Sequence, residues 1–432
     1  MPAHGWVGAR ATFSLAAHLA LRNTAPNSAE KKGSQSEGVA EGGGWGEEFR
    51  HALAPPFKIV VRLFMNTKRV VILFILWIIV VNFFAVLALN RFNLKGDTAY
   101  TWIDLSQFSQ NQQWNPIFLH ARWDSFWYLD IAQNGYIFKG VEKLSNIVFF
   151  PLYPLLIRTA SFLVGGNLIF AGWILSIIFL LLALIYFSKL VREFHNEVNS
   201  QLPLFFLLIF PTAFFLNTIY TESLFLFLSV AAFYYALKKN FVLAGIFGFF
   251  ASLTRITGVL LFIPLIWEYF KNYKFDRPFN KKLLSIFLVP FGTFSFFLFH
   301  YFKFGDFFLF LRVESWWGRA FNLNKDHFLL LTHPATVNLF VDILFVIFAV
   351  VATYFVFKKL RISYGLYMVA TLLIALSTGT FMSIGRYILV LFPIYILMAS
   401  VKNQYQKLTY IFLSTLLLAM NIILFVNNYW AG

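Results

Sequence analysis

The chain has 432 residues, of which 59% are hydrophobic and 12% are charged, and its formal net charge is +16. A soluble globular domain carries about 25% charged residues, so this composition excludes a soluble protein. The sequence contains no cysteine, which excludes disulfides, thiolate metal sites and cysteine nucleophiles.

The first 64 residues differ from the rest of the chain. They are rich in Gly, Ala, Ser and Glu and contain no apolar run long enough for a span or a signal peptide. Two interpretations remain open: a disordered tail, or a mis-called start with translation beginning at Met65, because the basic residues and apolar run that follow Met65 resemble the N-terminus of a membrane protein. In both cases we expect the folded domain to comprise residues 65–432.

Apolar runs recur through this domain at lengths near the roughly 20 residues that cross a bilayer. Eleven can be identified, at about 70–90, 160–188, 202–217, 222–237, 241–254, 256–270, 283–303, 336–357, 363–381, 386–400 and 408–428. Several of the middle runs are short for a full crossing, and some can pair or merge. The sequence therefore predicts an all-α, polytopic helical membrane protein with about 9–11 transmembrane spans.

The basic residues orient these spans, because cytoplasmic loops carry an excess of Lys and Arg. With Lys68 and Arg69 in the cytoplasm, the cytoplasmic segments hold 18 basic and four acidic residues. The positive charge is therefore a topology signal and argues against nucleic acid as a partner. Ten of the 14 carboxylates beyond the tail fall on the outer side, chiefly in two long loops at about 91–159 and 304–335. Long loops tend to carry function.

The first outer loop contains a segment with the signals of a helix. Asn115 can cap its start with Pro116 at the first helical position, and Asn134-Gly135 can supply its stop. An apolar stripe recurs every four residues, at Leu119, Trp123, Trp127 and Ile131. We expect one helix here, lying in the membrane interface where Trp and Tyr are favoured.

Two acids, Asp124 and Asp130, lie on this segment. They are six positions apart, or about 240° around a helix axis, so at most one is expected to act as a general base. The other is expected to be solvated or to pair with a nearby Lys or Arg. From spacing alone, a solvated interfacial helix explains both acids as well as catalysis does.

Two further outer segments carry motifs. Phe149 to Pro154 has two prolines three positions apart, which we expect to break any helix and to hold the chain extended at the membrane. The turn from Pro211 to Ser223 places Glu222 at the mouth of the bundle. Thr221 can cap the next helix, with Glu222 in its first turn. That structural role is sufficient to explain Glu222. Burying an acid at the mouth of an apolar bundle nevertheless costs enough free energy to suggest a function.

Arg255 and Arg386 lie between short apolar runs, again on the outer side. A buried arginine needs an anion. The anion is either an acid such as Glu222 or Asp124, or a phosphate, which the guanidinium binds with two parallel hydrogen bonds. Two outer arginines together with outer acids fit a phosphate-linked substrate.

These segments, in this order, resemble the second mannosyltransferase of GPI-anchor assembly (the PIG-V-like family) and its bacterial relatives. The resemblance is carried by Arg122-Trp123-Asp124, Phe149 to Pro154, Pro211 to Ser223, and Thr254-Arg255 with Gly258, with a weaker match at Gly385-Arg386-Tyr387. It implies the GT-C fold, a multi-span helical protein whose active site lies on the extracytoplasmic or lumenal side.

The resemblance also implies roles. Family members transfer a sugar, usually mannose, from a polyprenyl- or dolichyl-phosphate donor to a hydroxyl of a lipid or glycan acceptor, with inversion and without a metal or other cofactor. Asp124 matches the expected base, and Arg255 or Arg386 would stabilise the departing phosphate. Arg122, Trp123, Asp130 and Glu222 are the further candidates for substrate binding. The GPI acceptor is not carried over, because bacteria with such relatives generally lack GPI anchors.

Two other classes compete with a cell-membrane glycosyltransferase. A transporter or flippase of a lipid-linked sugar would show internal repeats and ionisable groups near the midplane. No clear repeat is seen, and the candidate groups crowd one face. A membrane scaffold without catalysis leaves the long aromatic loop with its acids unexplained.

Overall fold

The computed structural model describes residues 55–92, 116–273, 280–315, 336–378, 381 and 383–431, with the backbone alone at 55–66, 116 and 336–339. The chain divides into two compact units, Met1–Val61 and Arg62–Gly432. The predicted tail over residues 1–64 lies outside the described residues up to the start of helix α3 (Pro55–Arg91). The two interpretations of residues 1–64, a disordered tail or a mis-called start, stay predictions.

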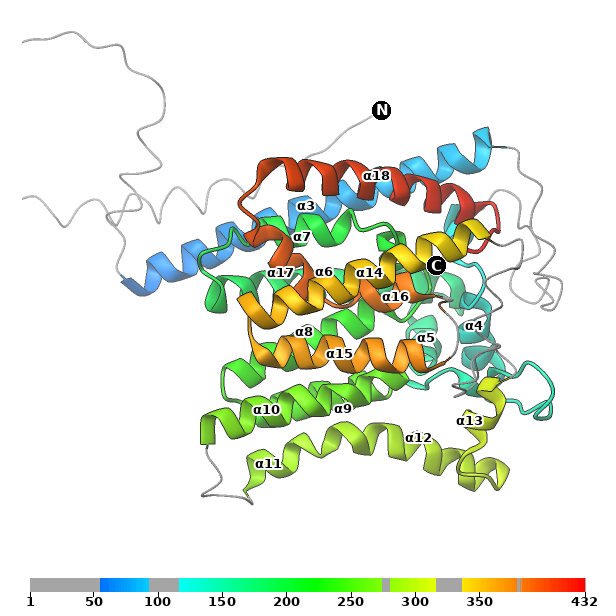
Figure 1. The fold of residues 1–432 in the computed structure, drawn as a ribbon. Helices are drawn as coiled ribbons and strands as arrows, with labels where there is room; N and C mark the ends of the chain where they lie inside the picture. The colour runs from blue at the N-terminus through cyan, green and yellow to red at the C-terminus, as the bar shows by residue number, and fades with distance from the viewer. Residues whose placement is uncertain are drawn as a thin grey trace, which may run out of the picture. The chain divides into compact units, whose positions relative to one another are not determined.

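The described part of the second unit contains helices and no strand (Figure 1). Four segments are long and apolar enough to cross a membrane. They are the Thr67–Arg91 part of α3, α6 (Leu168–Phe194), the Phe340–Lys359 part of α14 (Thr336–Lys359) and α18 (Gln404–Val426). This architecture confirms an all-α, polytopic membrane protein.

Shorter helices fill the remainder of the described chain. The α-helices are α4 (Ser125–Asn134), α5 (Leu152–Ser161), α7 (Gln201–Leu208), α8 (Glu222–Leu237), α9 (Phe241–Ser252), α10 (Phe262–Tyr273), α11 (Lys281–Ile286), α12 (Leu288–Phe304), α13 (Leu309–Glu314), α15 (Ile362–Ser377), α16 (Ile384–Leu389) and α17 (Pro393–Ser400). The 3₁₀ helices are η3 (Pro116–His120), η4 (Asn146–Val148), η5 (Phe162–Val164), η6 (Ala213–Asn217) and η7 (Ile256–Leu261).

Several of the predicted spans, among them those at 202–217 and 386–400, are not continuous α-helices. The run at 202–217 ends as α7 at Leu208 and resumes as η6. Pro211 explains the break, because it lacks an amide hydrogen and disfavours the helical conformation of the preceding residue. The run at 386–400 divides into α16 and α17, and Pro393 occupies the first turn of α17. Apolarity alone could not distinguish a span from two short buried helices.

Most helices of the second unit lie side by side and run across the view from one side of Figure 1 to the other. Helix α8 packs between α6 and α9, and α9 packs in turn against α11 and α12. Glycine permits the closest approach near the site: a Cβ at Gly258 would collide with the backbone of Ala251. This contact places η7 directly against the end of α9, so the residues between them are held in a tight turn.

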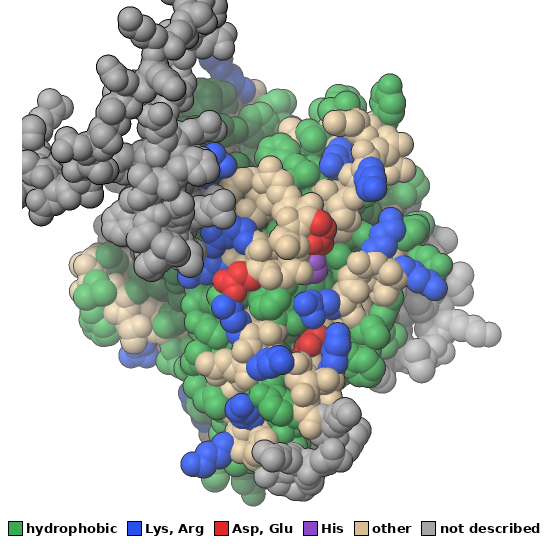
Figure 2. Space-filling model, turned by 90° about the vertical axis from the view of Figure 1, so that its left-hand side faces the viewer, with side chains coloured by type: hydrophobic (Ala, Val, Ile, Leu, Met, Phe, Trp, Pro, Cys, Tyr) green, Lys and Arg blue, Asp and Glu red, His purple; other side chains and the backbone are tan. Residues whose placement is uncertain are grey.

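Basic side chains gather at one end of this bundle. Helices α10 and α14 end on the left side of Figure 1, with Lys271 in the last turn of α10 and Lys358 and Lys359 in the last turn of α14. Figure 2 shows that end face on, with many Lys and Arg side chains across it. The C-terminal end of α18 lies at the opposite end, together with α4 and α13. The end of the bundle away from α4 and α13 is therefore rich in basic side chains.

Candidate active site

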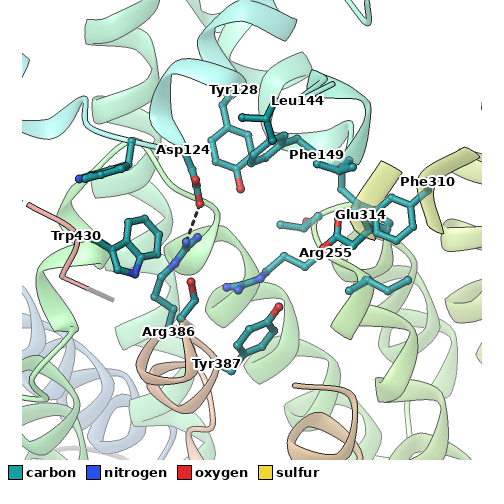
Figure 3. Close-up of a pocket in the computed structure, with 16 residues that line it drawn as sticks. Asp124, Tyr128, Leu144, Phe149, Arg255, Phe310, Glu314, Arg386, Tyr387 and Trp430 are labelled. Atoms are coloured by element: carbon teal, nitrogen blue, oxygen red, sulfur yellow. Dashed lines mark hydrogen bonds and ion pairs between the residues drawn. The ribbon is translucent and has the colours of Figure 1, made fainter. Parts of the chain in front are cut away.

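A cavity of about 330 Å³ lies at the end of the bundle that carries α4 and α13 (Figure 3). Four of the residues selected from the sequence line it: Trp123, Asp124, Arg255 and Arg386. They come from the first outer loop, from the turn between α9 and η7, and from α16. The structure thus brings three distant segments of the chain to one place.

The helix predicted from residue 116 to residue 134 is interrupted immediately before Asp124. Helix η3 ends at His120, and α4 begins at Ser125. Trp123, in the turn between them, has a φ of +50°, which residues other than glycine seldom adopt. The prediction of one continuous helix is therefore wrong, although its start at Pro116 and its end at Asn134 are confirmed.

Tertiary hydrogen bonds explain the interruption. The Tyr220 hydroxyl accepts a hydrogen bond from the Asp124 amide at 3.2 Å and donates to the Arg122 carbonyl at 3.0 Å. The indole nitrogen of Trp123 donates to the carbonyl of Tyr429 at 3.2 Å. These partners lie far away in the sequence and replace hydrogen bonds of a regular helix, so the turn holds Asp124 at the cavity.

His120, one turn before Asp124, is not a suitable base. Its ring stacks on Trp173 with ring centres 4.7 Å apart, and the side chain is buried. Burial lowers the pKa of His120 to about 3, because a charged imidazolium is disfavoured away from water. The imidazole is therefore neutral and a weak base at physiological pH.

Two acids and two arginines form a chain of ion pairs. Nη1 of Arg386 lies 2.7 Å from Oδ2 of Asp124, and Nε of Arg386 lies 2.8 Å from Oε1 of Glu222. Nη1 of Arg255 lies 3.1 Å from the same Glu222 oxygen. The Glu222 side chain is fully buried, whereas 20% of the Asp124 side chain is exposed. Glu222 therefore anchors both arginines, and of these two acids Asp124 is the one that a substrate can reach.

Aromatic rings fix the orientation of both guanidinium groups. The Arg386 guanidinium lies 4.6 Å from the centre of the Tyr220 ring, and that of Arg255 lies 5.2 Å from the centre of the Tyr387 ring. Such contacts favour a cation over the ring face. Figure 3 shows the two side chains directed toward the same space beside Asp124. The arrangement presents two fixed positive charges next to the accessible carboxylate of Asp124.

The position of Glu222 at the start of α8 agrees with the sequence, but its predicted cap does not. Thr221 occupies the N-cap position, and its side chain makes no capping hydrogen bond. The buried Glu222 is therefore stabilised by its ion pairs with Arg255 and Arg386, and the helix start has no threonine cap.

Arg122 and Asp130 do not line the cavity. Arg122 donates to the carbonyl of Ala121 at 2.9 Å and to that of Val426, at the end of α18, at 3.4 Å. Asp130 accepts hydrogen bonds from the amide groups of Asn134 at 2.8 Å and Asn146 at 2.7 Å. In this structure both residues fasten the first outer loop to itself and to the C-terminal helix.

Asp130→Ala is accordingly expected to weaken the fold rather than the chemistry. Two hydrogen bonds to a charged carboxylate are lost, so the free energy of unfolding should fall by about 1–3 kcal/mol. The thermal midpoint of the purified protein measures this change, and the activity per folded molecule measures the chemistry. A variant with an unchanged midpoint and no activity would show instead that Asp130 contacts a substrate.

The segment from Phe149 to Pro154 departs from its prediction in one respect. The chain is extended at Phe149, but α5 begins at Leu152 and includes Pro154 in its first turn. Proline is tolerated there because the first amides of a helix have no partner within it. The Leu152 amide donates to the Leu253 carbonyl at 3.0 Å, which ties this segment to the turn that carries Arg255.

Several residues at the cavity were not selected from the sequence. These are Tyr128, Glu314, Ser383, Tyr387 and Trp430. Burial raises the pKa of Tyr128 above its ordinary value, so its hydroxyl stays protonated and can donate. Trp430 packs edge to face against Trp123 at 5.4 Å. Tyr387 follows Arg386 in the weakest of the sequence matches, and Tyr128 and Glu314 lie in the two long outer loops, but no signal distinguished these residues from their neighbours.

The described residues include no group of three or more His, Asp or Glu side chains that could hold a metal ion.

The chain matches the family model described as Mannosyltransferase (PIG-V) over residues 54–315. It belongs to this mannosyltransferase family. The resemblance found in the sequence is thereby confirmed, and the chain is a membrane glycosyltransferase rather than a transporter or a scaffold. No curated protein and no solved structure matches the chain. The matched segment of the mannosyltransferase contains Asp124, Glu222 and Arg255, whereas Arg386 lies beyond it and reaches the site through the fold.

Proposed function

We propose that this mannosyltransferase is a GT-C enzyme that moves a mannosyl residue from a polyprenyl- or dolichyl-phosphate donor to a hydroxyl of a lipid or glycan, with inversion at the anomeric carbon. The cavity that would bind both substrates is the one lined by Asp124, Arg255 and Arg386. The observation that carries the proposal is the accessible carboxylate of Asp124 beside two arginines that Glu222 anchors.

The arginines fit a phosphate. Arg386 and Arg255 share Glu222 through one atom of each guanidinium group, and both side chains face the cavity in Figure 3. A phosphate placed between them would gain charge-assisted hydrogen bonds. These would strengthen as the phosphate gains charge on leaving, which is the condition for catalysis. Glu222 keeps both arginines in place without a substrate.

Asp124 is the proposed base. Arg386 engages its Oδ2 atom, and Oδ1 accepts no hydrogen bond within the described chain, so Oδ1 is the oxygen for a proton. The acceptor hydroxyl gives its proton to Asp124 while its oxygen forms a bond to the anomeric carbon. The bond from that carbon to the phosphate oxygen breaks, and the electron pair leaves with the polyprenyl phosphate. Trp123 would pack against the sugar, while Arg122 and Asp130 would hold the loop.

The basic end of the bundle supports an extracytoplasmic site at the opposite end. Cytoplasmic ends of membrane proteins are rich in Lys and Arg, and the basic end seen in Figure 2 is the end away from the cavity. The cavity would then open on the outer side of the cell membrane, where a lipid-linked donor presents its sugar.

The direct test is mannose transfer by the purified protein in vesicles. Polyprenyl-phosphate mannose labelled in the sugar is offered with extracted cell lipids and glycans, and nucleotide-linked mannose is offered in a parallel reaction. We expect label to move to the acceptors from the lipid-linked donor alone, and to remain on the donor when Asp124→Asn replaces the wild type. Transfer from the nucleotide-linked donor alone would refute the proposed donor, and no transfer from any polyprenyl-phosphate sugar would refute the proposed function.

A further inference from the structure

Ser383 is a buried polar residue without a structural explanation. It lines the cavity that contains Asp124 and Arg386, and only 2% of the residue is exposed. Its hydroxyl oxygen has no hydrogen-bond partner within the described chain. A buried hydroxyl without a partner loses the hydrogen bonds it would make to water, so a stable fold gains nothing from serine here.

The backbone of Ser383 is also held in an unfavourable conformation. Its φ is +67° and its ψ is 14°, the left-handed region that suits glycine and strains other residues. Its carbonyl accepts the amide of Arg386 at 3.0 Å, so this turn begins the short helix that carries the arginine. A glycine would form the turn with less strain, yet the chain has a serine. Strain of this kind at a cavity suggests a ligand.

We infer that the Ser383 hydroxyl donates a hydrogen bond to the phosphate of the substrate, completing a site whose charges come from Arg255 and Arg386. The inference rests on the proposed function. A hydroxyl beside two arginines faces a positive environment, in which the natural partner is an anionic oxygen that accepts. Rotation about the one side-chain torsion of serine can direct the hydroxyl toward that oxygen. The bound phosphate is either that of the sugar donor or that of the released polyprenyl phosphate.

Ser383→Gly separates binding from folding. It removes the hydroxyl and relieves the backbone, so the thermal midpoint should equal or exceed that of the wild type. The KM for the polyprenyl-phosphate sugar and the inhibition constant of polyprenyl phosphate should each rise about tenfold, the effect of one hydrogen bond to a charged group. Ser383→Ala removes the hydroxyl but keeps the strained backbone. It should therefore show the same kinetic change, with a thermal midpoint below that of Ser383→Gly. Inorganic phosphate, tested as an inhibitor in parallel, shows whether the site needs the lipid.

Lys239→Gly is the matched control. Lys239 also has a left-handed backbone, with a φ of 61°, but it lies exposed in the turn between α8 and α9. This variant should relieve the same strain without changing either constant. A folded Ser383→Gly protein with both constants within twofold of the wild type would overturn the inference.

Failure of the proposed function would be distinguishable. If no sugar is transferred, polyprenyl phosphate should still raise the thermal midpoint of the wild type and do so less in Ser383→Gly. If polyprenyl phosphate raises the thermal midpoints of the wild type and of Ser383→Gly equally, the inference about Ser383 is overturned independently of the proposed function.

Discussion

Asp124→Asn is expected to lower mannose transfer by about 10²–10⁴-fold while leaving the protein folded. That range is the usual contribution of general acid–base catalysis. Asparagine has nearly the same shape and keeps an oxygen that can accept the hydrogen bond from Arg386, now 2.7 Å from the carboxylate, but it cannot take the proton of the acceptor hydroxyl. The initial rate at saturating donor and acceptor measures the loss.

The control for this substitution removes an acid from the same outer loop. Glu142 is exposed and does not line the cavity, so Glu142→Gln should transfer at the wild-type rate. Thermal midpoints of both variants should lie near that of the wild type, because the Asp124 side chain is partly exposed and Arg386 retains Glu222. An Asp124→Asn protein that keeps more than a tenth of the wild-type turnover would show that another group accepts the proton.

The fold could be predicted from the sequence wherever one local property decides it. Long apolar runs gave α3, α6, α14 and α18 because a helix is the one open structure that satisfies its own backbone in lipid. The same rule could not divide the run at 386–400, since buried helices within a bundle are as apolar as spans. Its division depends on Pro393 and on packing against neighbouring helices.

The site likewise combines features that local sequence predicts with features that depend on tertiary packing. The sequence selected Asp124, Glu222 and Arg255 by charge in apolar surroundings, and the structure places them together. It could not predict the turn at Trp123, because hydrogen bonds donated to Tyr220 and Tyr429 stabilise that turn. Both partners are defined by tertiary packing, so their effect is invisible to periodicity.

Residues contributed by the C-terminal part of the chain were the hardest to predict. Arg386 lies 262 positions from Asp124, outside the segment that matches the family, and it was selected on a weak match. Glu314 lies in the second long outer loop but was not distinguished from its neighbours, and Ser383 and Trp430 carry no sequence signal, because a single polar or aromatic residue beside an apolar helix is common. Their place at the cavity follows from the packing of α13, α16 and the chain after α18.

Arg386→Met is expected to abolish transfer and to lower the free energy of unfolding by about 3–5 kcal/mol. Methionine fills much of the same volume but leaves Asp124 unpaired, and Glu222 then has a single remaining arginine. Breaking a buried ion pair on one side has this cost because a charge remains in the interior without its partner. Denaturation of the purified protein and the transfer rate report the two effects separately.

The double variant Arg386→Met with Glu222→Gln distinguishes structure from chemistry. Removing both charges breaks the Arg386–Glu222 pair from both sides, so the losses of unfolding free energy in the two single variants should be strongly non-additive, as expected for residues in contact. Transfer should not return, because the phosphate has lost the guanidinium group of Arg386. If the losses of unfolding free energy in the two single variants simply add, the ion pair between Arg386 and Glu222, 2.8 Å apart, does not stabilise the fold. Recovered transfer would show that Arg386 only supports the fold, and the phosphate would then depend on Arg255 alone.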